Sequence, residues 1–536
     1  FEKDGRESSI ALLAGEDLGL IVNGKSDGSA RDDAGTQVMS GILPLLMHPN
    51  PKTAMVVGLG TGTTSGWIAD VPSMERVDVV ELEPVVVDIA EYYNPVNRNA
   101  LSNAKHHTSV GDAREVLLTT RETYDVIFSE PSNPYRAGIA SLYTRDFYTV
   151  AARRLRKNGL FVQWVQMYSI DTRTMKSIYA TITSVFPNVD TWTTTAGDIV
   201  IVASRDPIVY DANLMRSRLA VEPYRSGAHV AWRAESAEGV MAHFIGSEKL
   251  ARAGAVGAEL NTDDRPVIEF SFARSLGRDV DLMNELDATA KRLNAARPTN
   301  VRGTYDWNAV DSNRASMSWI RSADPKNDFA RKYDNGDYTG ALAAWRANPW
   351  QPSNSYDNAM LGHVLAEAGD DAALTYIDPL RPWQPIEAEA LTGLLLYRKG
   401  NFAGAATLFS NALTRYREDP WPLPRLMNVA IDTIAESARD PKAGELAVDA
   451  LAQPFSAYLL EEQRGRAFLV ASWEAKRCGA STLTALREFE PNVPWRASVL
   501  QMRAVCYAAA NLPALNKRAQ QDLLEFSEGE LQRVAQ

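Results

Sequence analysis

Three glycines near residue 60 form a turn that could hold a nucleotide. Gly58, Gly60 and Gly62 follow an apolar run that begins at residue 54, and they precede a segment that opens with hydroxyl side chains. Glycine at such a turn lets a ligand lie against the backbone, and the free amides that begin the next helix face its polar groups. We expect Gly58, Gly60, Thr61 and Gly62 to contact a nucleoside cofactor.

Acidic residues follow the next two strand-like runs. Glu81 lies about twenty residues after the glycine turn, where a carboxylate can accept hydrogen bonds from both ribose hydroxyls. Asp112, before Ala113, follows the run 106–110, and it could bind an adenine amino group. It could equally cap a helix that begins at Ala113, and the two roles are compatible.

Glu130 is the candidate catalytic residue. It lies in the segment SEPSNP (129–134), where two prolines fix a loop at the carboxyl edge expected for the sheet. There it could accept a proton from an ammonium nucleophile or hold a cationic substrate. Alternatively, Glu130 pairs with Arg136 or Arg145 and only orders the loop.

Strand-like and helical segments alternate between residues 54 and 204, which predicts an α/β fold with a parallel sheet covered on both faces. Two runs around 196–198 predict a closing antiparallel hairpin. Asn23-Gly24 predicts a tight turn in a small β-rich region, and 36–47 reads as a helix. The predicted domains are 1–50 (β-rich subdomain and entry helix), 51–215 (nucleoside-binding core), 216–285 (extension) and 286–536 (helical).

The last region is rich in alanine and leucine and has motifs that begin at Gly336, Gly369 and Gly400. Their spacing is close to the ~34-residue period of tetratricopeptide helix pairs. We expect a tetratricopeptide-like all-α domain that binds a protein partner; an irregular helical domain is the alternative.

The composition limits the possible partners. A net charge of -11 argues against nucleic acid as a ligand. Cys478 and Cys506 have no metal-ligand spacing, so reduced, buried thiols and no metal site are expected. No apolar run is long enough to span a bilayer. The start at Phe1 predicts that an upstream segment has been removed.

Residues 1–205 resemble the spermidine synthase (polyamine aminopropyltransferase) family. The matching segments are LPLLMHPNPKTAMVVGLGTG, RVDVVELEPVVVDIA, GDAR, YDVIFSEPSNP and LYTRDFY. The resemblance implies a Rossmann-like S-adenosylmethionine-dependent transferase core with a small N-terminal β subdomain. It also implies that Glu81 meets the ribose, Asp112 the adenine, and that Glu130 occupies the position of the family's catalytic Asp.

Several positions depart from the family pattern. Thr61 replaces the acid of the glycine-rich motif, Asn133 replaces the second acid of the catalytic loop, and Thr36-Gln37 replace a Tyr-His pair. Gln37 and Asn133 are therefore expected to bind the acceptor. A dicationic amine needs paired carboxylates to offset its desolvation, so these replacements weaken the case for putrescine.

The arrangement of SEPSNP, NTDDRPVIEF (261–270) and a helical tail also looks like the soluble region of bacterial proteins with an upstream multi-spanning membrane segment. That resemblance implies a location on the cytoplasmic side of the inner membrane; a homodimer is also conceivable. The segment at Asp263 to Arg265 is interpreted as a charged turn.

We expect a transferase that moves an aminopropyl or methyl group from decarboxylated S-adenosylmethionine, or from S-adenosylmethionine itself, to an amine acceptor. Thr61 would favour the intact cofactor, because an acid there would repel its carboxylate. The alternative is a catalytically lapsed nucleoside-binding or scaffold module. A nicotinamide oxidoreductase is less well supported, since Ser65 replaces the last glycine of the dinucleotide pattern.

Overall fold

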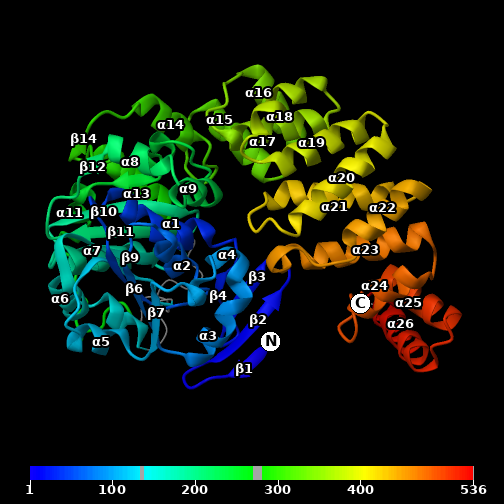
Figure 1. Cartoon of the computed structure of the whole chain (residues 1–536), viewed down its shortest axis with the longest axis horizontal. Helices are drawn as coiled ribbons and strands as arrows, with labels where there is room; N and C mark the ends of the chain where they lie inside the picture. Colours follow the sequence, from blue (N-terminus) through cyan, green and yellow to red (C-terminus); the bar gives the residue numbers. More distant parts are fainter. Residues whose placement is uncertain (133–137, 270–280, 535–536) are drawn as a thin grey trace. The chain divides into compact units, whose positions relative to one another are not determined.

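The computed structural model describes residues 1–132, 138–269 and 281–534. The chain divides into two compact units, which are treated separately below (Figure 1). The core unit comprises Phe1–Leu13 and Asp17–Asp357, and the helical unit comprises Ala14–Glu16 and Asn358–Gln536. The predicted domain limits, including a helical region from residue 286, stay a prediction.

The core unit begins with a four-stranded sheet in the order β1-β2-β3-β4. Its strands are β1 (Glu2–Asp4), β2 (Ser9–Ala14), β3 (Leu18–Val22) and β4 (Lys25–Ser29). Asn23 and Gly24 form the turn between β3 and β4 with φ angles of 52° and 77°, the left-handed conformation that this dipeptide favours in tight hairpins. The β-rich start and its turn are confirmed.

A mixed sheet of eight strands forms the centre of this unit, in the order β13-β10-β11-β9-β8-β5-β6-β7. The strands are β5 (Thr53–Val57), β6 (Arg76–Glu81), β7 (His106–Val110), β8 (Tyr124–Ser129), β9 (Leu155–Gln166), β10 (Asn188–Thr195), β11 (Asp198–Ser204) and β13 (Phe244–Gly246). The strands from β9 to β7 pair in parallel, whereas β11 pairs antiparallel with β9 and with β10. The α/β class and the closing hairpin are therefore confirmed, and β13 is an edge strand that the sequence pattern did not indicate.

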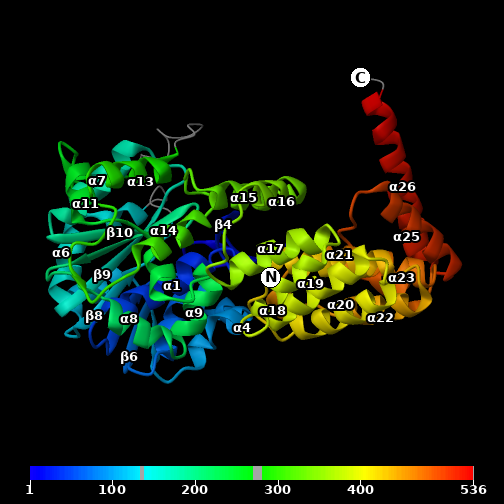
Figure 2. The same ribbon diagram turned by 90° about the horizontal axis from the view of Figure 1, so that it is seen from above.

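Helices cover both faces of the sheet, as Figure 2 shows for α1 on one face and α7 with α11 on the other. The helical segments of the core fold are α1 (Ala34–Met47), α2 (Thr63–Asp70), α3 (Pro84–Ile89), η1 (Ala90–Tyr93), α4 (Asn94–Asn97), η2 (Ala100–Ser102), α5 (Ala113–Thr119), η3 (Ile139–Tyr143), α6 (Arg145–Arg154) and α7 (Thr172–Thr183). A further group follows the hairpin: β12 (Tyr210–Asp211), α8 (Ala212–Leu219), α9 (Tyr224–Trp232), α10 (Ala237–Met241), α11 (Glu248–Ala255), α13 (Leu282–Arg292), β14 (Val301–Arg302), α14 (Trp307–Ala315), α15 (Pro325–Asp334) and α16 (Tyr338–Ala347).

Helix α1 lies close to its neighbours because it presents small residues to them. All of its residues are buried. A Cβ atom on Gly35 would lie 2.8 Å from the Thr194 carbonyl oxygen, and one on Gly41 would lie 2.8 Å from that of Thr64. Any larger side chain at either glycine would push α1 away from β10 or α2. The glycines thus bring Thr36 and Gln37 to the edge of the sheet.

The helical unit contains pairs of antiparallel helices. Its elements are α17 (Ser355–Glu367, which begins in the core unit), η4 (Asp371–Ala373), α18 (Leu374–Leu380), α19 (Pro385–Arg398), α20 (Phe402–Tyr416), α21 (Pro424–Ser437), α22 (Pro441–Leu451), η5 (Ser456–Tyr458), α23 (Glu461–Ala475), α24 (Ala480–Glu488), α25 (Ala497–Ala509) and α26 (Pro513–Val534). Gly369 and Gly400 follow α17 and α19 with φ angles of 68° and 81°, as expected where a left-handed residue ends a helix. The all-α character is confirmed, whereas a tetratricopeptide-type repeat stays a prediction.

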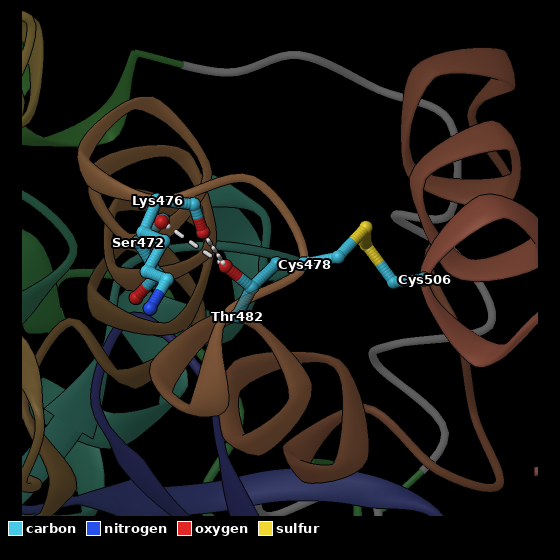
Figure 3. The surroundings of a disulfide bond; sticks show 5 residues. All are labelled: Ser472, Lys476, Cys478, Thr482 and Cys506. Carbon is cyan, nitrogen blue, oxygen red and sulfur yellow. Dashed lines mark hydrogen bonds between the residues drawn. A yellow bond between two sulfur atoms is a disulfide. The ribbon is translucent and has the colours of Figure 1, made fainter. Parts of the chain in front are cut away.

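The two cysteines form a disulfide, which corrects the expectation of reduced thiols (Figure 3). Cys478 lies in the turn before α24, and Cys506 lies on α25, with a Cα–Cα distance of 4.9 Å. On α24, the Thr482 hydroxyl contacts the carbonyl oxygens of Ser472 and Lys476, at 3.0 Å each. A separation of 28 residues along the chain carries no information on proximity, which the packing of the helices decides.

Over the described ranges, no helix is both long enough and apolar enough to cross a membrane.

Candidate functional site

The glycine turn joins β5 to α2 at the carboxyl edge of the sheet. Gly58, Gly60 and Gly62 have φ angles of 93°, 53° and 78°, a region that residues with a Cβ rarely adopt. A Cβ on Gly58 would lie 2.9 Å from the Glu130 carbonyl oxygen, whereas one on Gly60 would meet nothing within 4 Å. The turn therefore packs tightly against the loop after β8 and leaves open space at Gly60 for a ligand to approach the backbone.

Glu81 ends β6 directly beside this turn. Its carboxylate accepts hydrogen bonds of 2.8 Å from the backbone amides of Leu59 and Glu83. Burial raises its pKa, and these amide contacts oppose the rise. The amides of Gly60 and Leu82 also contact it, so the protein itself uses much of the carboxylate's capacity for about four hydrogen bonds. Glu81 lies beside the turn as predicted, and its contact with a ribose stays a prediction.

Asp112 is the N-cap of α5, as the second interpretation of this residue expected. Its Oδ1 accepts a 2.7 Å hydrogen bond from the Arg114 amide, and its side chain is exposed. Ala113, the first residue of the helix, is buried. Asp112 follows β7 as Glu81 follows β6, so both carboxylates lie at the same edge of the parallel sheet. Capping uses one oxygen and leaves the other free for an adenine amino group.

Glu130 follows β8 at this edge, beside the glycine turn. The Thr64 hydroxyl of α2 donates a 2.7 Å hydrogen bond to its Oε2. Burial raises the Glu130 pKa to about 8, and the negative charges of Asp33 and Asp198 add to the rise. Glu130 forms no ion pair with Arg145, while Arg136 lies outside the described residues. A carboxyl group with a pKa near neutrality is suited to accept a proton.

Gln37 lies next to the glycine turn, where a substrate contact was predicted. The Thr61 hydroxyl lies 2.8 Å from Gln37 Oε1. The Thr64 hydroxyl, whose single proton is shared between two acceptors, lies 2.9 Å from the Gln37 carbonyl oxygen as well as 2.7 Å from Glu130 Oε2. The two departures from the family pattern at positions 37 and 61 therefore contact each other. Asn133, the other predicted substrate contact, lies outside the described residues.

Two further carboxyl groups, which the sequence reasoning missed, lie near Glu130. Asp33 precedes α1 and accepts a 2.9 Å hydrogen bond from the Ser29 hydroxyl. Asp198 begins β11, and its Oδ2 accepts a 3.0 Å hydrogen bond from the Thr36 hydroxyl. Burial raises the pKa of Asp33, and it raises that of Asp198 to about 6. The available signal was an acid in the turn at 196–198, at the start of an otherwise apolar strand.

We call Asp33, Glu130 and Asp198 the acidic cluster. The negative charge of Asp33 raises the pKa of Glu130 and of Asp198, and the charge of Asp198 raises the pKa of Glu130. In the described part of the chain, no arginine or lysine forms an ion pair with any of them. Asp17 differs, because it pairs with Arg31 at 3.1 Å although both side chains are only 5% exposed. The acidic cluster can therefore hold a cation.

No group of three or more potential metal ligands has a metal-binding arrangement within the described ranges. The hydroxyl groups of Ser29, Thr36 and Thr64 donate hydrogen bonds to the acidic cluster, and no ion pair among the described residues offsets its negative charge. A bound cation would offset that charge.

Residues 35–198 match the family model of the spermine/spermidine synthase domain. The resemblance drawn from the sequence motifs is thereby confirmed for this part of the chain. All of the predicted site residues fall within the matched range. Of the acidic cluster, Glu130 lies within it, Asp198 is its last residue, and Asp33 lies just before it.

Curated relatives align with about one third of the chain. Thermospermine synthase ACAULIS5 of Arabidopsis thaliana is 32% identical over 190 residues, which cover 34% of this chain and 56% of that protein. A polyamine aminopropyltransferase of Nitrosomonas europaea is 33% identical over 145 residues, covering 27% of this chain and 44% of the relative. One from Bacillus cereus is 26% identical over 180 residues, covering 33% and 65%. The chain thus spans about half to two thirds of the length of these relatives.

Solved structures that match part of the chain include a spermidine synthase in complex with the transition-state analogue AdoDATO. It has a TM-score of 0.36 and 20% identity, and it covers 38% of this chain and 73% of that one. Human methyltransferase-like protein 13 in complex with SAH has a TM-score of 0.27 and covers 32% and 80%.

Proposed function

We propose that the core unit transfers an aminopropyl group from decarboxylated S-adenosylmethionine to an amine. The observation that carries this proposal is the uncompensated acidic cluster beside the glycine turn. Buried carboxylates without a countercharge are costly, and a bound cation offsets that cost. An amine acceptor and a decarboxylated cofactor both bring cationic groups to this position.

The cofactor is held by the residues at the carboxyl edge of the sheet. Gly60 offers open backbone, Glu81 lies beside the turn at the position for the ribose, and Asp112 has an oxygen not used in capping for the adenine. When bound, the sulfonium nucleoside supplies a carbon made electrophilic by its positively charged sulfur.

The acidic cluster favours the decarboxylated cofactor over S-adenosylmethionine. The loss of an acid at Thr61 alone would admit the carboxylate of the intact cofactor. Glu130, however, contacts the same glycine turn, and Asp33 and Asp198 add negative charge near it. A cofactor carboxylate placed there would be repelled, so aminopropyl transfer is the better supported of the two reactions.

Glu130 accepts the proton that the reaction releases. As the acceptor nitrogen bonds to the electrophilic carbon, the carbon–sulfur bond breaks and its electron pair neutralises the sulfur. One N–H proton of the acceptor then passes to Glu130, whose pKa is raised to about 8 by burial, which makes it a stronger base than an ordinary carboxylate. Thr64 orients the carboxyl group through its hydrogen bond to Oε2.

The test is an assay of the purified protein with each cofactor and a panel of alkyl diamines. We expect formation of methylthioadenosine from decarboxylated S-adenosylmethionine, and no S-adenosylhomocysteine from the intact cofactor. Formation of S-adenosylhomocysteine with a methylated amine would instead establish methyl transfer. Binding of either cofactor without any product would support the lapsed, scaffold-type alternative, in which the helical unit recruits a protein partner.

A further inference from the structure

The turn between β1 and β2 is tied to the cofactor edge of the central sheet by one carboxylate. Glu83 follows β6, which ends at Glu81, and it is only 5% exposed. Its Oε2 accepts hydrogen bonds of 2.8 Å and 3.3 Å from the backbone amides of Glu7 and Ser8. A single buried side chain therefore joins the N-terminal sheet to the segment that carries Glu81.

Gly5, in the same turn, makes this contact possible. A Cβ on Gly5 would lie 2.3 Å from the Glu83 carboxyl carbon, so any other residue there would push the carboxylate away from the turn. A second polar contact between the two segments lies at the surface, where Lys3 of β1 pairs with Asp88 of α3 at 2.9 Å and both side chains are more than half exposed. Exposed ion pairs contribute little to stability, so the Glu83 contact is the stronger restraint.

The backbone of Glu83 extends this link to the predicted nucleoside site. Its amide donates a 2.8 Å hydrogen bond to Glu81 Oε1, and the Leu59 amide of the glycine turn donates to Oε2 at 2.8 Å. Hydrogen bonds thus run from the β1–β2 turn through Glu83 and Glu81 to the glycine turn.

Glu83 also caps α3, because its Oε1 accepts a 3.2 Å hydrogen bond from the Val85 amide. Capping alone is served well by the shorter side chain of Asp. The extra methylene of Glu is what the reach to the β1–β2 turn requires. The two roles of Glu83 can therefore be separated by side-chain length.

We propose that Glu83 is a positioning residue that couples the β1–β2 turn to nucleoside binding by fixing the orientation of the Glu81 carboxylate. This inference rests on the proposed function, because it takes Glu81 as the group that meets the ribose of the cofactor. Anchoring the Glu83 side chain in the turn restrains the backbone between residues 81 and 83, so the Glu81 carboxylate is held ready for the ligand. By linkage, a nucleoside that stabilises this arrangement must stabilise the turn in return.

The test measures methylthioadenosine binding by titration calorimetry and hydrogen exchange of the turn by mass spectrometry. Glu83→Asp retains an N-cap for α3 but is too short to reach the turn. Gly5→Ala breaks the same contact from the other side and leaves Glu83 in place. Asp88→Asn is the matched control, because it removes the exposed link between the same two segments.

We expect Glu83→Asp and Gly5→Ala each to weaken methylthioadenosine binding about tenfold, through the loss of hydrogen bonds to a charged group. Asp88→Asn should stay within about twofold of the wild-type protein. Saturating methylthioadenosine should slow exchange in the wild-type peptide that contains Glu7 and Ser8, by a similar factor of about ten, and Glu83→Asp should abolish this protection. In the assay of the proposed reaction, the KM for the cofactor should rise in both variants while kcat is retained.

Wild-type affinity in Glu83→Asp and Gly5→Ala, with thermal unfolding showing that both are folded, would overturn the inference. Exchange of the turn that methylthioadenosine leaves unchanged would overturn it as well. The proposed function fails separately. In that case methylthioadenosine would bind with the expected dependence on Glu83, yet the wild-type protein would form none of it from decarboxylated S-adenosylmethionine and an amine.

Discussion

Charge is handled in opposite ways in the acidic cluster of the core unit and in the buried ion pairs of the helical unit. In the helical unit, Arg503 has no exposed side-chain surface and donates to Glu490 and Asp522, while Arg464 donates to Glu461 and Glu488. In the acidic cluster of the core unit, three carboxyl groups accept hydrogen bonds from hydroxyl groups and form no ion pair among the described residues.

The comparison distinguishes charges that are compensated within the protein from charges that a bound ligand would compensate. A buried arginine with two carboxylates is compensated within the protein, so removing it leaves unpaired charge behind. The acidic cluster costs free energy in the folded protein, and that cost is recovered when a cation binds. Shifted pKa values, and the lack of countercharges among the described residues, therefore support the proposed functional site.

The largest expected effect is on catalysis at the acidic cluster. Replacing Glu130 by Gln removes the proton acceptor but retains the hydrogen-bonding shape, so kcat should fall about 10³-fold, or ~4 kcal/mol in the activation barrier. Cofactor affinity, measured by calorimetry, should change little. Glu115→Gln on α5, which lies outside the site, serves as the control; equal turnover in both variants would show that Glu130 is not the base.

The pH profile gives a second view of the same group. Because Glu130 must be deprotonated to act as a base, kcat/KM of the wild-type protein should rise with pH through about 8.

The next effect tests the compensated charges of the helical unit. Arg503→Met should lower the free energy of unfolding of that unit by ~3 kcal/mol, because Glu490 and Asp522 lose their countercharge. Urea denaturation followed by circular dichroism measures the loss. Arg487→Met, an exposed arginine of α24, should change the stability little, and a similar loss in both variants would contradict a special role for the buried arginine.

Reduction of the disulfide should have a smaller effect on the helical unit. The bond joins residues separated by 28 positions, and opening a loop of that size costs ~2 kcal/mol or somewhat more, through the freedom regained by the unfolded chain. Denaturation with and without a reductant measures it, with the Cys506→Ala variant as the control that no longer responds. Diamine binding should be retained after reduction, and its loss would break the division of roles between the two regions.

The smallest effect concerns stability at the acidic cluster, and it has the opposite sign. A carboxyl group whose folded pKa is raised costs stability as pH rises from its ordinary value through the raised one. For Asp198 this window runs from about 4 to about 6. Asp198→Asn should therefore stabilise the core unit by ~1 kcal/mol at pH 8 and not at pH 4.

Thermal unfolding at both pH values measures this gain. Asp17→Asn should instead destabilise the core unit at pH 8, because Asp17 pairs with Arg31. If both variants were destabilising, the acidic cluster would be an ordinary compensated network.

Much of the core fold could be predicted from local pattern. The buried runs that became β5, β6 and β8 are apolar and β-branched, and Gly58 and Glu81 stand at their ends. Residues that follow successive parallel strands lie at the same edge of the sheet, because those strands end there. The nucleoside half of the site follows from that rule.

Other features depend on contacts between distant segments. Cys478 and Cys506 were expected to be reduced, because nothing in their spacing shows that α25 brings one against the turn that holds the other. In the same way, Asp33 and Asp198 stand far apart in the chain, and neither belongs to a motif.

The sequence by itself thus determined the α/β class, the glycine turn and the position of Glu130, because strand ends and turns are encoded by neighbouring residues. Only the tertiary structure showed which carboxyl groups lie at the proposed acceptor site. Glycines in α1 let that helix approach β10, Thr36 then holds Asp198, and a carboxylate from a distant strand joins Glu130. Such long-range electrostatic neighbours have no local signature, because burial and proximity arise only when the chain has packed.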